Sequence, residues 1–292
     1  MANTQAIKHR ITSVKNTKQI TKAMELVAAS KLRRAQEQSS RSRAYKNSAR
    51  EILARLSQLT RLQDFELYQV QTISARLTVV FTSDRGLAGA YNSNILKKFL
   101  QQHTKDQDNS VVTKVIVIGR KGAQALARIE GVELVGVYND WPNYPNSHDI
   151  APLFENARKL FVDGEVQQVD VLYTDYKSSI MQEATQEQLL PANLADEIEG
   201  VEVGRDINDA IFEPSPDEVV RRVVPRLVEI QLYQFALEAS ASEQSMRMMA
   251  MKSASDNAGD LIDDLTLEFN SARQAAITQE LAEITGGAAA IS

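Results

Sequence analysis

Hydrophobic positions near the start of the chain recur every three or four residues, which is the repeat of an amphipathic α-helix. Residues 3 to about 58 contain neither glycine nor proline and are rich in Lys, Arg, Gln, Ala and Leu, which favour helix. We expect one long helix, which at 1.5 Å per residue would extend over roughly 80 Å. Such a helix must project from its domain or be enclosed by another chain. The repeat is formed by Ile7, Ile11, Val14, Ile20, Met24 and Val27.

A second helical repeat occupies the end of the chain, and a start signal precedes it. Ser215 can cap a helix, and Pro216 suits the first helical position. The repeat alternates between spacings of three and four, which indicates coiled-coil packing, and it predicts a helix that runs to Ile284. Pro225 is expected to bend this helix near its base, and Gly259 to weaken it about halfway along. The seam consists of Val220, Val223, Leu227, Ile230, Gln234, Leu237, Ala254, Ala258, Leu261 and Leu265.

The middle of the chain has a different pattern, in which short apolar runs rich in Val and Ile alternate with stretches of helical character. This alternation predicts a compact, Rossmann-like α/β domain with a mostly parallel sheet. The fold class is therefore α/β, with a long antiparallel coiled coil of the N- and C-terminal helices plus this central domain. The three parts are expected at 1–60, 75–205 and 214–292. The expected strands are 76–82, 113–119, 132–138 and 169–176, and the expected helices are 92–104, 121–128 and 151–163.

Charge is distributed very unevenly along the chain. Residues 1–61 contain fourteen Lys and Arg against three Glu, a net charge of +11, while the whole chain has a net charge of −5. The remaining residues therefore have a net charge of −16, and the last stretch, 241–292, is acidic. Two long helices of opposite charge most simply pair antiparallel, and a basic arm for an anionic partner is also compatible with this split.

Composition excludes several kinds of chemistry. The chain has no cysteine, which rules out disulfides, thiolate metal sites and thiol catalysis, and its three histidines (His9, His103 and His148) are scattered, which argues against a histidine metal site. The longest aliphatic runs are far shorter than the ~20 residues that a membrane helix needs, and the N-terminus has no secretory signal pattern. A cytosolic or peripheral location is expected.

Two glycine loops follow predicted strands, but neither has a nucleotide-binding spacing. Residues 86–92 (GLAGAYN) and 119–123 (GRKGA) match neither G-x-G-x-x-G nor the phosphate-binding P-loop, so tight strand-to-helix turns are the favoured interpretation. Asp84 and Arg85, beside the first loop, suggest a turn with an internal ion pair. The basic stretch 31–43 has no interleaved aromatic residues, so a solvated helix face competes with phosphate binding there.

Several long motifs together resemble the gamma subunit of F-type ATP synthases. They cover both terminal helices nearly end to end and the entry to the middle domain, in the order of the family. Departures are modest: Ala88 and Ala90 stand where the family commonly has Cys and Gly, and Thr285 where Val is usual. The matching segments are RITSVKNTKQITKAMELVAASKLRRAQ (10–36), TSDRGLAGAYN (82–92), FEPSPDE (212–218), SEQSMRMMAMKSASDNA (242–258) and ARQAAITQELAEITGGAAA (272–290).

The resemblance implies a rotor that is not itself catalytic, in a complex that synthesises ATP. The terminal helices would form a shaft inside a hexamer of three alpha and three beta subunits, and the central domain would lie on the c-ring beside the epsilon subunit. The chain would be peripheral to the membrane, at the cytoplasmic face of a bacterial plasma membrane, with no cofactor, metal or nucleic acid. The small apolar tip GGAAAIS (286–292) would suit rotation inside an apolar sleeve.

The resemblance also assigns partner contacts residue by residue. A polar catch against a beta subunit is expected on the last helix, and a second surface is expected to face acidic loops of the beta subunits. Glu243 and Arg247 match positions that couple the two helices to that region. The catch would consist of Arg273, Gln274, Thr278 and Glu280, and the second surface of Met24, Lys31, Arg33, Arg34 and the loop with Asp84, Arg85 and Ala88.

Two other functions compete with the rotor. A coiled-coil tether or nucleic-acid binder would use the basic helix, but it would gain nothing from an inert C-terminal tip. A nucleotide-dependent enzyme built on the α/β domain would need convergent titratable groups, and the middle of the chain does not indicate them.

Overall fold

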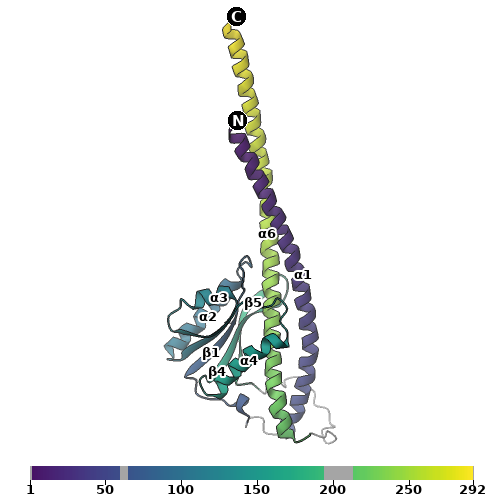
Figure 1. Cartoon of the computed structure of the whole chain (residues 1–292), viewed down its shortest axis with the longest axis vertical. Helices are drawn as coiled ribbons and strands as arrows, with labels where there is room; N and C mark the ends of the chain where they lie inside the picture. The colour runs from purple at the N-terminus through teal and green to yellow at the C-terminus, as the bar shows by residue number, and fades with distance from the viewer. Residues whose placement is uncertain (1, 60–64, 194–212, 292) are drawn as a thin grey trace. The chain divides into compact units, whose positions relative to one another are not determined.

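The computed structural model of the chain describes residues 2–59, 65–193 and 213–291 (Figure 1). Two long helices flank an α/β arrangement, as the sequence predicts. In chain order the elements are α1 (Ala2–Leu59), η2 (Glu66–Tyr68), β1 (Ala75–Phe81), α2 (Tyr91–Asp108), β2 (Val112–Ile118), α3 (Arg120–Leu126), β3 (Val132–Tyr138), α4 (Ser147–Val162), β4 (Gln168–Tyr176), β5 (Gln182–Leu190) and α6 (Pro216–Ile291).

The described residues divide into two compact units. The first, here called the helical unit, comprises Met1–Ala28 and Arg247–Ser292, that is, the first part of α1 and the last part of α6. The second, called the sheet unit, comprises Ala29–Met246 and contains the rest of both helices and all five strands.

The sheet has the order β3-β2-β1-β4-β5. Strands β1 to β4 are parallel, and β5 pairs antiparallel with β4. The four parallel strands confirm the expected ones, whereas β5 was not predicted. Its sequence, QEATQEQLL, has polar or small residues at seven of nine positions, because an edge strand needs no continuous apolar run.

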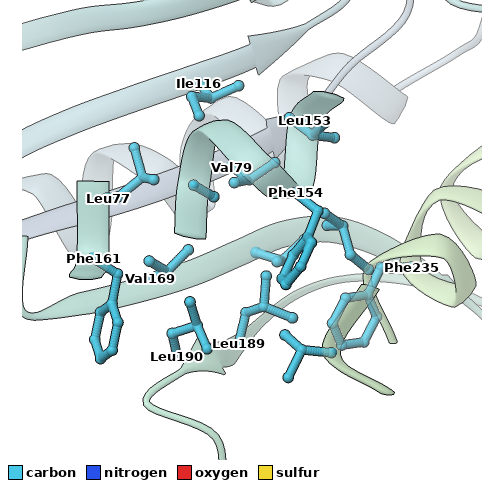
Figure 2. Close-up of a cluster of buried hydrophobic side chains, with 14 of the residues drawn as sticks. Leu77, Val79, Ile116, Leu153, Phe154, Phe161, Val169, Leu189, Leu190 and Phe235 are labelled. Atoms are coloured by element: carbon cyan, nitrogen blue, oxygen red, sulfur yellow. The ribbon is translucent and has the colours of Figure 1, made fainter. Parts of the chain in front are cut away.

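Both faces of the sheet are covered by helices. Val79 and Val80, adjacent on β1, point to opposite faces, as the two-residue repeat of a strand requires. Val80 packs with Ile95 and Phe99 of α2 and Leu126 of α3. Val79 packs in the larger cluster with α4 and the first part of α6, where Figure 2 shows Leu153, Phe154, Phe161 and Phe235 converging with β-strand side chains.

Helix boundaries differ from the sequence prediction where side chains outside the apolar repeat determine them. Helix α4 begins at Ser147, four residues before the expected start, because Asn146 and Asp149 form a reciprocal capping box. Helix α6 remains a single helix across Pro225 and Gly259, and it continues to Ile291 instead of ending at Ile284. Its start agrees with the prediction, since the Glu218 N–H donates to the Ser215 hydroxyl at 3.3 Å.

In the helical unit, α1 and α6 run antiparallel (Figure 1). The helices approach closely at Gly259, where an added Cβ would lie 2.8 Å from Lys18 Nζ. Gly259 therefore leaves room for the lysine ammonium group. The buried apolar residues described in this unit are Ile7, Ala28, Met251, Ala258 and Leu265. None of the helices in the described part of the chain is both long and apolar enough to cross a membrane.

Candidate functional site

One carboxylate ties together three loops at the carboxyl-terminal edge of the sheet. Asp84, directly after β1, accepts hydrogen bonds from the backbone N–H groups of Arg120 (3.1 Å), Asp140 (3.2 Å) and Trp141 (2.9 Å). The Arg120 guanidinium lies 4.0 Å from the same carboxylate and also pairs with Asp140. Only 19% of the Asp84 side chain is exposed, so this residue positions the loops. The neighbouring Arg85 side chain is exposed.

Two glycines after β2 are required because this connection approaches β1 very closely. A Cβ at Gly119, where φ is +95°, would lie 2.4 Å from the Thr82 carbonyl oxygen. A Cβ at Gly122 would lie 2.4 Å from Thr82 Oγ1, which accepts a hydrogen bond from the Gly122 N–H at 3.0 Å. Thr82 therefore occupies the space beside this turn, as expected for a packing turn and not for a phosphate loop.

The loop between β1 and α2 is held from within. The Asn92 amide oxygen accepts from the Ser83 N–H (3.0 Å), and the Ser83 hydroxyl donates to the Arg85 carbonyl (2.7 Å). Ala88, an expected contact, is only 3% exposed, whereas its neighbour Leu87 is 63% exposed at φ +63°. An exposed leucine in the left-handed region is uncommon and is often associated with function. Sequence reasoning did not single out Leu87, since only the backbone reveals this conformation.

The basic residues of α1 in the sheet unit lie beside the long loop that follows β3. Lys31 Nζ donates to the Asn143 side chain at 3.0 Å, and the Arg34 guanidinium lies 5.8 Å from the centre of the Tyr144 ring. Arg33 is exposed and pairs with Glu37 on its own helix at 3.1 Å. The loop is joined to α6 as well, because the Ser240 hydroxyl donates to the Asn143 carbonyl at 2.8 Å. Tyr144 thus supplies the aromatic face that the basic stretch itself lacks.

Glu243 is half-buried in the same part of the sheet unit. On either side of it along α6, Ser242 donates to the Thr174 carbonyl (2.8 Å) and Ser245 to the Ser179 carbonyl (3.2 Å). The sheet unit therefore brings together Lys31, Arg34 and the long loop, and the Asp84 cluster with Arg85 and Ala88.

The other expected contact residues belong to the helical unit. Met24 and Arg247 are half-buried. Arg273, Gln274, Thr278 and Glu280 are all exposed on α6, and the Thr278 hydroxyl donates to the Gln274 carbonyl at 2.9 Å, a bond within the helix. The side chains of this group are therefore accessible to another chain, as a polar contact requires.

Within residues 2–59, 65–193 and 213–291, His, Asp and Glu side chains form no group of three or more that could hold a metal ion. His103, one of the scattered histidines, is buried, with Nδ1 3.0 Å from the Thr113 hydroxyl and Nε2 3.1 Å from the Glu130 carbonyl. Its hydrogen bonds are those of a satisfied core residue.

Comparison with known proteins identifies the family. A family model described as ATP synthase matches residues 3–291. The ATP synthase gamma chain of Acidithiobacillus ferrooxidans is 41% identical over 291 residues, with both chains covered completely. The chain belongs to the ATP synthase gamma-chain family. The gamma chain of Acidithiobacillus ferridurans is also 41% identical, over 99% of this chain and 96% of its own length.

Solved structures agree with this gamma-chain assignment. A chain from the central stalk and c-ring structure of the Tetrahymena thermophila mitochondrial ATP synthase has a TM-score of 0.62 and 25% identity, covering 81% of this chain and 99% of its own. A chain from the Euglena gracilis mitochondrial ATP synthase has a TM-score of 0.68 at 18% identity, covering 99% and 95%, and supports the fold. The resemblance and fold class expected from the sequence are confirmed, and the chain is the rotor subunit of an F-type ATP synthase.

Proposed function

We propose that this gamma chain is a non-catalytic central-stalk rotor that couples ion flow through a c-ring to ATP synthesis at three beta subunits. The alpha and beta subunits would enclose the helical unit, and the sheet unit would contact the c-ring and the epsilon subunit. The chain would then be peripheral to the membrane, at the cytoplasmic face of a bacterial plasma membrane.

The observation that supports this proposal best is the exposed apolar surface of the helical unit. Few apolar side chains are buried there, while many large ones are exposed along both helices. Ile277, Leu281 and Ile284 follow one another at spacings of four and three and so share one face of α6, and an apolar face left uncovered on a folded protein commonly marks an interface. The exposed side chains are Ile20, Leu26, Val27, Met249, Leu261, Leu267, Ile277, Leu281 and Ile284.

The mechanism that we propose uses contact energy, without bond chemistry in this chain. An asymmetric shaft presents a different face to each beta subunit, and each face stabilises a different nucleotide state. Rotation therefore changes which state is favoured at each site, by the difference in contact free energy between states. This role needs rigid, differently shaped surfaces and no convergent titratable groups.

Two surfaces are proposed to make these contacts. On the sheet unit, Lys31, Arg33, Arg34 and Arg85 would meet carboxylates of the beta subunits, while Asp84 holds the loops in position. On the helical unit, the catch of Arg273, Gln274, Thr278 and Glu280 would form charge-assisted hydrogen bonds with a beta subunit. Met24, Glu243, Arg247 and the loop around Ala88 would adjoin these surfaces.

Charge reversal tests the function. In a variant with Lys31→Glu, Arg33→Glu and Arg34→Glu, we expect weaker assembly with purified alpha and beta subunits and lower ATP hydrolysis by the assembled complex. The matched control reverses Lys97, Lys98 and Lys105, which are exposed on α2, and should assemble normally. Salt-sensitive binding of DNA or RNA by the native chain, lost in the first variant alone, would support a nucleic-acid binder instead.

A further inference from the structure

A buried polar bridge joins α1 to α6 inside the sheet unit. Gln234 occupies a position in the apolar seam of α6 and is only 4% exposed. Its Nε2 donates to Ser39 Oγ on α1 at 2.9 Å and to Glu238 Oε1, one turn along α6, at 2.8 Å. The Glu238 carboxylate therefore orients the amide toward α1.

This bridge lies between surfaces that specify register weakly. The buried side chains described on the α1 part of the sheet unit are Leu32, Ala35, Ser39 and Ala54, three of which are small. On α6, the seam positions before and after Gln234 are the buried Ile230 and Leu237, whereas Ala236 and Ala239 pack in the core with the strands. Because apolar side chains recur along this seam at spacings of three and four, a shift by one repeat would place one apolar side chain where another had been, so packing alone distinguishes the two registers weakly.

Burying the Gln234 amide costs free energy of folding, which indicates a role other than stabilisation. Gln234 Oε1 is buried and has no hydrogen-bond partner among the described residues. An apolar residue of the same volume would avoid this unsatisfied acceptor. Polar residues in coiled-coil seams are best attested as devices that fix register at a cost in stability.

We propose that the Gln234–Ser39 bridge is a positioning device that fixes the axial register of α1 against α6. A slip of one helical turn, about 5.4 Å, would separate the two side chains and leave the Gln234 amide facing apolar groups. For the rotor role proposed above, on which the functional part of this inference rests, a fixed register lets the two helices turn as one body.

The test measures register directly by spin-label distances. Cysteines replace Ser30 and Arg222, both exposed in the sheet unit, in a chain that has no cysteine of its own. Because Ser30 precedes Ser39 by nine residues and Arg222 precedes Gln234 by twelve, the labels are offset by about 30 Å along the antiparallel pair. A slip of one turn therefore changes the distance by about 5 Å.

We expect one narrow distance in the native background, both in the full chain and after assembly with alpha and beta subunits. Gln234→Met keeps the volume and removes the bridge, and it should broaden the distribution or add a second distance while raising the melting temperature. Ser39→Ala should broaden it too, and Ser39→Thr, which keeps the hydroxyl, should restore the native distance. Gln244→Met is the matched control, since Gln244 is also buried on α6 but bonds to its neighbour Glu243.

A single narrow distance in Gln234→Met, equal to the native one, would overturn the register proposal. Assembled complexes add a second reading, in which proton pumping per ATP hydrolysed should fall in Gln234→Met and stay native in Gln244→Met. Failure of the rotor role would appear as loss of assembly in the native chain, whereas the distance in the full chain reports on register alone.

Discussion

The helical unit and the sheet unit contain the same two helices, yet they bury apolar side chains to very different extents. In the sheet unit, α6 contributes Val220, Val224, Val228, Leu232 and Phe235 to a core that includes four strands and α4. In the helical unit, the same helix leaves most of its large apolar side chains exposed. In the sheet unit, the strands and α4 cover the apolar face of α6. A single partner helix has too little facing surface to cover a whole apolar stripe.

The comparison indicates where the stability of this protein resides. Burial of a full apolar side chain contributes about 1.5 to 3 kcal/mol, so the sheet unit accounts for nearly all internal hydrophobic stabilisation. The helical unit depends on burial that other subunits would provide. This difference in burial suits a rotor, because apolar side chains that are not packed in an internal core remain available to contact other subunits.

The largest expected effect is a difference in hydrogen exchange between the two units of the isolated chain. Amides in β1 and β2 should exchange orders of magnitude more slowly than amides between residues 261 and 286. Local opening of 261–286 exposes little additional apolar surface and therefore costs little free energy. Exchange followed by mass spectrometry would measure both segments. Assembly with alpha and beta subunits should protect 261–286, and equal protection of both segments in the isolated chain would contradict the comparison.

Truncation of one leucine in each unit sharpens the same contrast. Leu77→Ala removes a fully buried side chain and should lower the free energy of unfolding by about 2 to 5 kcal/mol. Leu267→Ala removes a side chain that is 71% exposed and should change it by less than about 0.5 kcal/mol. Urea unfolding of the two variants measures both values. A loss above 1 kcal/mol for Leu267→Ala would mean that this surface is already covered within the chain.

The polar catch should affect rates and leave folding intact. Arg273→Ala with Gln274→Ala removes groups whose hydrogen bonds to a charged partner are worth ~1.5 to 3 kcal/mol each, so we expect ATP synthesis and hydrolysis to fall by at least roughly tenfold, the factor that the loss of one such bond gives. Proton-driven synthesis is measured in vesicles with equal amounts of assembled complex.

Gln279→Ala with Glu283→Ala is the control for the catch, because these residues are exposed on the same helix and bond to each other at 2.9 Å. This pair should retain native rates. Native rates in the Arg273 and Gln274 variant would remove the catch from the mechanism.

The smallest expected effect concerns alkaline stability of the sheet unit. Burial, together with the nearby charges of Glu238, Glu187 and Asp175, raises the pKa of Tyr173 well above its usual value of 10. The neutral phenol thus stabilises the fold fully below pH ~10, and this contribution is lost as pH rises further. Tyr173→Phe, which also loses a hydrogen bond to Glu187 (3.1 Å), should show a shallower stability loss above pH 10.

Urea midpoints of the native chain and Tyr173→Phe between pH 7 and 11 measure this effect. At neutral pH the variant should be less stable by about 0.5 to 1.5 kcal/mol, the net value of an ordinary hydrogen bond, because Glu187 is exposed and water can replace the phenol as its donor. Parallel pH profiles in the two proteins would contradict a raised pKa for Tyr173.

Regular repeats were the most predictable part of this protein. The two long helices and four parallel strands follow from apolar periodicity alone, because burial on one face or on both determines those residues. Strand β5 could not be predicted, because its mostly polar sequence has no apolar repeat. It becomes a strand through backbone pairing with β4. The early start of α4 was readable in principle, from Asn146 and Asp149 at capping-box spacing.

The candidate contact surfaces were less predictable than the fold. The partner contact expected for Asp84 stays a prediction. Its hydrogen bonds to backbone N–H groups 36 and 56 positions further along the chain could not be predicted, because no local sequence pattern indicates them. The exposure of Leu87 and burial of Ala88 depend on one left-handed φ angle. Family resemblance selects the loop around Ala88, whereas the backbone conformation determines which side chain of that loop is exposed.

Strand β5 and the part of the last helix beside the sheet run in opposite directions. Because β5 is antiparallel, it returns the chain to the edge where the parallel strands begin, pairing Leu190 with Val169. Helix α6 runs back in the direction of β4, since Phe235 packs on Tyr173 and, further along, the Ser242 hydroxyl donates to the Thr174 carbonyl. The chain thus reverses its direction along the sheet twice, once between β4 and β5 and once between β5 and α6.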